Sequence, residues 1–388
     1  MTDTAALRRR RAPLVALAVV VLFAGLWGGL IRLGLFVPTV ITAAGAEHGP
    51  LMALGFLGAL ISLERAVALN RPWAYAAPLA AGAGTLISLS GAPGALGPAL
   101  VSFGGFVVLG AHLTLHRRQA SAHNAVMGLG ALAWCAAGID WMLGADPSAF
   151  APLLAGFLVL TIVGERLELT RAAHRSARVH RLLLVAIMIF CCGLGISLGA
   201  ERLGVRLAGL GLLGQALWLA RYDVARRTVR IAGVTRYMAS GLLMGYVWLT
   251  CAGILWLARP SLADGPAYDA QLHAVFLGFV MSMVFAHAPV IVPAVLRVRL
   301  PYHRSFYAHL VLLHLSLAGR LIGGDLLGSH PAWQWGGVGN GTAILLFLAV
   351  TGVAVAGAER RSRNPPLGRA PRPGAGSTAP VIEELRRR

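Results

Sequence analysis

Long uninterrupted runs of apolar residues dominate the sequence from about residue 14 to residue 357. A transmembrane helix needs ~20 apolar residues to cross ~30 Å of hydrocarbon, and about twelve runs reach or approach that length. They cover residues 14–36, 48–69, 74–92, 97–115, 123–143, 149–168, 180–200, 203–220, 234–257, 269–296, 304–322 and 337–357. Only the short turn Pro93–Leu96 separates the third run from the fourth. The pattern predicts an all-α polytopic membrane protein.

Related motifs recur in three of these runs. Gly-Phe pairs stand at positions 55/56, 156/157 and 278/279, and Glu-Arg pairs follow at 64/65 and 165/166. The first and third motifs open with a histidine, His48 and His273, whereas the second opens at Ala151. This repetition predicts that the membrane domain consists of three four-helix pseudo-repeats.

The charges are distributed so as to indicate topology. The net charge is +19, all of it from arginine, and Arg-rich connections alternate with connections that hold few basic residues. Because basic loops stay in the cytoplasm, we expect a basic cytoplasmic N-terminus at 1–13, a membrane domain at 14–357 and a disordered Arg/Pro-rich cytoplasmic tail at 358–388. No folded basic domain suggests a nucleic-acid partner. The expected location is a bacterial inner (cell) membrane, with lipid as the surrounding partner.

Two histidines are expected to meet near the outer face of the membrane. His48 opens the second run and His273 lies near the start of the tenth, and both runs cross from outside to inside. Two neutral imidazoles at equal depth on different helices are suited to bind one metal, as in a six-coordinate haem. The alternative is a pair of interfacial histidines hydrogen-bonded to carbonyl groups.

A second candidate site lies deeper. His287 is fourteen residues after His273, which places it ~21 Å along the helix and ~40° around it. His314, on the next antiparallel run, should reach a similar depth, and His309 lies close enough to support it. These residues predict a second haem or a metal ion, with a polar clasp between helices as the alternative. Pro289 and Pro293 should kink the helix just after His287.

The charged residues inside the runs allow two interpretations. Glu64-Arg65 and Glu165-Arg166 are predicted to form ion pairs between helices, with a proton relay as the alternative. Asp140 and Arg320 are expected near the outer face, where they could bind haem propionates or each other. The other histidines, including His112, His116 and His123, are typical of interfacial positions.

Twelve spans, three repeats and histidines opening spans two and ten resemble subunit I of the haem-copper oxidases. More closely, the chain resembles the NnrS family, twelve-span haem- and copper-containing proteins linked to nitric oxide. The resemblance implies a haem held between His48 and His273, together with copper and nitric oxide. The haem should be b-type, because no Cys-x-x-Cys-His is present. Span ten lacks a His-x-His, span seven lacks a His-His pair, and span six has Gly-Glu-Arg where the oxidases supply a copper ligand.

The expected function is therefore haem binding in a membrane protein that acts on or responds to nitric oxide, including as a nitric oxide reductase-like oxidoreductase. Quinol or a separate electron-donor protein would supply electrons. Two alternatives stay open. A proton-coupled secondary transporter would use His287, His314 and Glu165 to bind substrate or protons. A di-haem electron conduit would stack two b haems across the membrane.

Overall fold

The computed structural model describes residues 2–35, 38, 43–91, 94–171, 176–261 and 265–363. The predicted tail at 358–388 lies outside the described residues from position 364 onward. Within the described ranges the chain is helical and contains no strand. The predicted all-α class is confirmed, as expected for apolar runs whose backbone groups must pair within the segment.

Eleven helices in the described ranges are long and apolar enough to cross a membrane. The predicted run 74–92 is not among them, because it forms the short 3-10 helix η2 (Pro72–Tyr75) followed by a helix of 14 residues, α5 (Ala76–Leu89). The remaining elements are α1 (Thr2–Arg32), α2 (Ala43–Ala46), α3 (His48–Pro50), η1 (Leu51–Leu57), α4 (Gly58–Leu69), α6 (Leu96–Arg118), α7 (Ala122–Met142), α8 (Pro147–Arg171), α9 (Ala177–Ser197), α10 (Glu201–Tyr222), α11 (Ala225–Thr228), α12 (Val234–Ala258), α13 (Pro266–His273), η3 (Ala274–Met281), α14 (Ser282–Leu296), α15 (Phe306–Ala318), η4 (Gly319–Leu326) and α16 (His330–Arg363).

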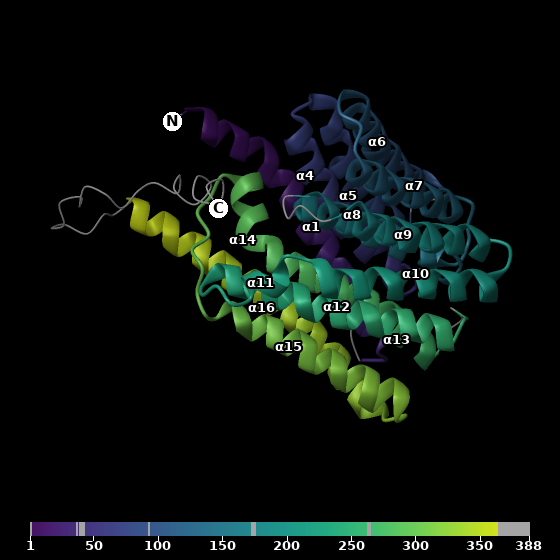
Figure 1. The fold of residues 1–388 in the computed structure, drawn as a ribbon. Coiled ribbons are helices and arrows are strands. Elements are labelled where there is room, and N and C mark those ends of the chain that lie inside the picture. Colours follow the sequence, from purple (N-terminus) through teal and green to yellow (C-terminus); the bar gives the residue numbers. More distant parts are fainter. Residues whose placement is uncertain are drawn as a thin grey trace.

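Several helices that follow one another in the sequence, such as α6 and α7 or α9 and α10, lie side by side (Figure 1). The hairpin of α9 and α10 shows why, since Gly193 lies against the backbone of Ala208 and Gly204 lies against the backbone of Ser197. A methyl group at either glycine would overlap that backbone. Such small-residue contacts are typical of helix packing in membranes, where burial of apolar surface does not drive association.

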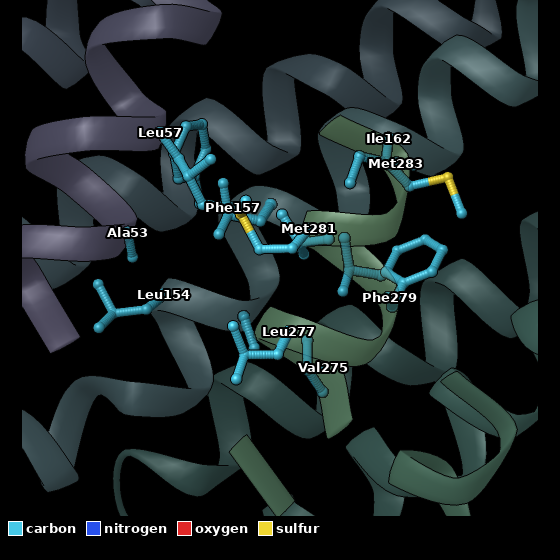
Figure 2. Packing of buried hydrophobic residues seen from close by; sticks show 14 of the residues in the cluster. Ala53, Leu57, Leu154, Phe157, Ile162, Val275, Leu277, Phe279, Met281 and Met283 are labelled. Carbon is cyan, nitrogen blue, oxygen red and sulfur yellow. The ribbon is translucent and has the colours of Figure 1, made fainter. Parts of the chain in front are cut away.

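Helix α8 lies at the centre of the bundle. Of its most apolar stretch 83% is buried, compared with 28% for α1 and 17% for α16. Figure 2 shows Leu154 and Phe157 of α8 beside Leu57 of η1, with Leu277 and Met281 of η3 close by. The segments that follow His48 and His273, η1 and η3, therefore both pack against the buried helix α8.

Two of the three repeated motifs are π-helical. The Gly-Phe pair at 55/56 lies in η1 and the pair at 278/279 lies in η3, whereas the pair at 156/157 lies in the regular helix α8. A π-helix is rare and occurs often at functional sites, because its wider turn redirects side chains. The two motifs preceded by a histidine are thus the ones with this geometry.

The glycine contacts lead to a test of the packing. Replacing Gly193 by Ala places a methyl group on the backbone of Ala208, and overpacking of this kind costs about 1–3 kcal/mol. We expect a lower thermal unfolding midpoint in detergent. Gly195→Ala on the same helix is the control, since nothing lies within 4 Å of its added carbon. Equal midpoints for the two variants would contradict the packing argument.

Candidate functional site

His48 and His273 meet across a shared cavity. His48 begins α3 directly before η1, and His273 ends α13 directly before η3. Their ring centroids are 6.4 Å apart and the ring planes differ by 26°. The convergence of these two imidazoles, expected from their position in the sequence, is confirmed.

Hydrogen bonds fix which nitrogen of each ring is available. Nδ1 of His48 lies 2.7 Å from the carbonyl oxygen of Gly25, and Nδ1 of His273 lies 2.9 Å from that of Asp269. A carbonyl only accepts, so in each ring Nδ1 donates the proton. A neutral imidazole then keeps its lone pair on Nε2. Both rings are therefore prepared to act as Nε2 ligands.

The cavity around the two rings has a volume of about 920 Å³. This value lies in the upper part of the ~300–1,000 Å³ range of cofactor and ligand sites. Side chains from α1, η1, α8, η3, η4 and α16 line it; most are apolar, such as Met52, Phe276 and Trp333, and Arg32 and Asp325 add charge. Ala53, Leu57, Leu154, Leu277 and Met281 form one wall, and they appear together in Figure 2.

The spacing of the rings suits a metal ion between them. A metal–nitrogen bond is ~2.0 Å and a ring centroid lies ~1.1 Å beyond its nitrogen, so two imidazoles on opposite sides of one ion have centroids ~6.2 Å apart. The observed value is 6.4 Å. Rings in ordinary packing contact have centroids ~4.5–7 Å apart, so the separation by itself fits both arrangements. The preference for a metal ion comes from the carbonyl contacts of both Nδ1 atoms. The donor set, two imidazoles whose Nδ1 atoms bind carbonyl groups in a mostly apolar cavity, fits a b-type haem.

An ion pair supports His273. Arg320 of η4 donates from Nε to Asp269 Oδ2 at 2.7 Å and from Nη2 to Oδ1 at 2.6 Å. The same Oδ1 lies 3.2 Å from Nδ1 of His273. The expected pairing of Arg320 with Asp140 is wrong, because Arg320 binds Asp269 with two hydrogen bonds from its planar guanidinium. Binding of a haem propionate by Arg320, which lines the cavity, stays a prediction.

Glycines of α1 position His48, and sequence reasoning missed them. Gly25 supplies the carbonyl that binds Nδ1, Gly28 lies against the backbone of Ala44, and a methyl group on Gly29 would lie 3.1 Å from Cε1 of His48. The spacing Gly25-x-x-x-Gly29 is a known sequence pattern for close helix contact in membranes. It could have identified α1 as the partner of His48.

His287 binds an arginine instead of a second imidazole. Its Nδ1 donates to the carbonyl of Met283 at 2.7 Å, and its Nε2 accepts from Nη1 of Arg166 at 3.2 Å. Arg166 also pairs with Asp223, with 3.1 Å between Nε and Oδ2 and side-chain exposures of 4% and 0%. His287 therefore joins a buried charged network that links α8, α14 and the end of α10, as a polar clasp would.

His309 and His314 belong to two further networks. Nε2 of His309 lies 3.0 Å from the hydroxyl of Tyr237, which donates to the carbonyl of Phe285. Nδ1 of His314 accepts from the indole nitrogen of Trp248 at 3.0 Å, so its proton is on Nε2. Among the described residues no three of His, Cys, Asp or Glu are grouped to hold a metal ion. The second site with His287, His309 and His314, and its copper, stay predictions.

The Glu-Arg motifs do form ion pairs. Nη2 of Arg65 lies 2.6 Å from Oε1 of Glu165 and 3.0 Å from Oε1 of Glu64. The expected pairing between α4 and α8 is confirmed. Arg65 also binds its sequence neighbour, because its long side chain can fold back onto Glu64 while it reaches Glu165.

Comparison with known proteins gives a family but no activity. A family model described as a domain of unknown function (DUF8744) matches residues 11–356. The chain therefore belongs to this family of proteins. No curated protein and no solved structure matches the chain.

The buried ion pair leads to a stability test. Asp223→Asn keeps the hydrogen bond that Oδ1 accepts from the backbone of Ala225 but leaves Arg166 without its counter-charge. An uncompensated buried charge costs about 3–5 kcal/mol. We expect a much lower thermal unfolding midpoint in detergent. Glu359→Gln, which removes the exposed pair with Arg8, should cost less than ~1 kcal/mol. Similar losses in both variants would contradict this assignment.

Proposed function

We propose that this protein is a multi-pass membrane protein that binds one haem b between His48 and His273 and passes electrons through it. The observation that carries the proposal is the 6.4 Å separation of two rings whose Nδ1 atoms are both committed to carbonyl groups. That arrangement leaves two Nε2 lone pairs for one metal ion. For this reason we favour the interpretation that the two histidines bind iron over the alternative that they are merely interfacial residues.

Each residue of the site has a defined part in this proposal. His48 and His273 would hold the iron through their Nε2 atoms. Leu154, Leu277 and Met281 exclude water from one side of the cavity, which favours the less charged form of a redox centre. The haem, when bound, supplies one-electron chemistry. Quinol or a separate electron-donor protein is the proposed source of electrons.

A role linked to nitric oxide is proposed from the resemblance to the NnrS family. If His48 and His273 both held the iron, a diatomic ligand would bind only where one of the two histidines had left. Acting on or responding to nitric oxide would therefore depend on exchange at this site. Copper is left out of the proposal, because the described residues hold no group of three suitable ligands.

We further propose twelve crossings with both termini on the cytoplasmic side. The N-terminal end of α1 and the C-terminal end of α16 lie on the same side (Figure 1), where Arg8 and Glu359 form an ion pair of 2.6 Å. An even number of crossings is needed to bring them there. The segment of η2 and α5, with 4 and 14 residues, extends ~29 Å and supplies the twelfth. The matching π-helices support a repeat origin for at least the first and third units.

The topology can be tested with reporters. Fusion of a fluorescent protein that folds only in the cytoplasm should give signal when it is attached before Arg8 and also when it is attached after residue 363. Fusion within the turn between α9 and α10, at Gly199, should be dark, because that turn is on the opposite side under twelve crossings. A bright Gly199 fusion, or only one bright end, would overturn the arrangement.

The haem can be tested by spectroscopy. Protein purified in detergent from haem-replete cells should show a Soret band and about one haem b per chain by pyridine haemochromogen assay, since two imidazoles would hold the iron. Replacing both His48 and His273 by Ala should abolish the band. His303→Ala is the control, because that ring is exposed and binds Ser305.

The same measurements separate haem binding from the alternative functions. Colourless wild-type protein would reject the haem. The buried network of Arg166, Asp223 and His287 then favours a proton-coupled transporter, for which flux into proteoliposomes should depend on a pH gradient. Two haems with two reduction potentials would favour the di-haem conduit.

A further inference from the structure

The two proposed axial ligands have unequal support. Nδ1 of His273 lies 2.9 Å from the carbonyl oxygen of Asp269 and 3.2 Å from the Oδ1 of the same residue. Nδ1 of His48 has the carbonyl oxygen of Gly25 at 2.7 Å and no carboxylate. A carboxylate on the far nitrogen raises the basicity of an imidazole and strengthens its bond to a metal. His273 is therefore the stronger donor.

The carboxylate that supports His273 is itself held in place. Two hydrogen bonds from Arg320, of 2.7 and 2.6 Å, fix both oxygens of Asp269. Arg320 in turn lies over the ring of Trp333, 5.9 Å from its centroid, and only 9% of its side chain is exposed. Three elements, α13, η4 and α16, thus fix the orientation of His273. Rotation of the His273 ring would break its contacts with Asp269, and Asp269 cannot follow the ring because Arg320 holds both of its oxygens.

His48 is held by less. Its ring nitrogen is bound by a carbonyl of a different helix, α1, across a contact that depends on Gly25 and Gly29. His48 is the first residue of the continuous helix His48–Leu69, so it has no preceding turn of its own helix to bind its Nδ1. A local change at the α1 contact would therefore release the His48 ring, whereas His273 has two direct contacts with Asp269, which η4 and α16 hold in place.

We propose that His273 is the permanent axial ligand and that His48 is the exchangeable one, so that a small diatomic molecule gains access to the iron on the His48 side. This inference rests on the proposed haem binding and deepens it by assigning the open position. Asp269 and Arg320 act as positioning residues for His273. The buried contacts of Arg320 hold Asp269 in place beside His273.

Single variants distinguish the two ligands. His48→Ala should keep most of its haem, show a five-coordinate spectrum and, when reduced, bind carbon monoxide at least tenfold faster than wild type. His273→Ala should lose most of its haem. Imidazole added to His48→Ala should restore the six-coordinate spectrum, which shows that the variant is folded and that its open position is on the His48 side.

Asp269 has its own readout. Asp269→Asn removes the negative charge beside Nδ1 of His273, and a weaker donor should raise the reduction potential of the haem. Asp140→Asn is the control, because Asp140 is a carboxylate of α7 that does not line this cavity. Its effect on the potential should be smaller.

Two kinds of failure can be told apart. Wild-type protein without haem would reject the proposed function itself. Wild-type protein with haem, combined with equal haem loss in both single variants or with retention only in His273→Ala, would overturn the assignment of the exchangeable ligand alone. An Asp269→Asn potential equal to that of wild type would overturn the role of the carboxylate.

Discussion

His48 and His273 each donate a hydrogen bond from Nδ1 to a main-chain carbonyl group. The arrangement of the site depends on these two hydrogen bonds. The bond fixes the tautomer and the plane of each ring. It also explains why α1 must approach so closely, since the carbonyl of Gly25 comes from that helix. Without these hydrogen bonds, either nitrogen of each imidazole could carry the proton. The lone pair that can bind a metal ion would then have no fixed position in either ring.

Buried ion pairs are a second constraint, and they hold the helices that carry His48 and His273. Helix α8 is buried along most of its length and binds its neighbours at its far end through charges, Glu165 to Arg65 and Arg166 to Asp223 and His287. Buried charges are costly unless each has its partner. The network therefore specifies one alignment of α4, α8 and α14, and η1 and η3 are placed on either side of α8 as a result.

Part of the site could be predicted because depth in a membrane follows from position along a run. His48 and His273 begin runs of the same direction, so their equal depth required no tertiary information. The pairing of His287 with Arg166 could not be predicted, because the two residues lie 121 positions apart and face each other only through helix rotation. For the same reason the pairing of Arg320 with Asp269 instead of Asp140 could not be predicted.

The sequence alone determined the helical class, the apolar runs and the matched positions of His48 and His273 near the starts of their runs, since each follows from local composition and length. Tertiary structure decided which nitrogen each ring presents, which histidine has a carboxylate behind it, and that His287, His309 and His314 belong to separate networks. The physical reason is that depth is a property of one helix. A hydrogen bond depends on how two helices are rotated about their axes.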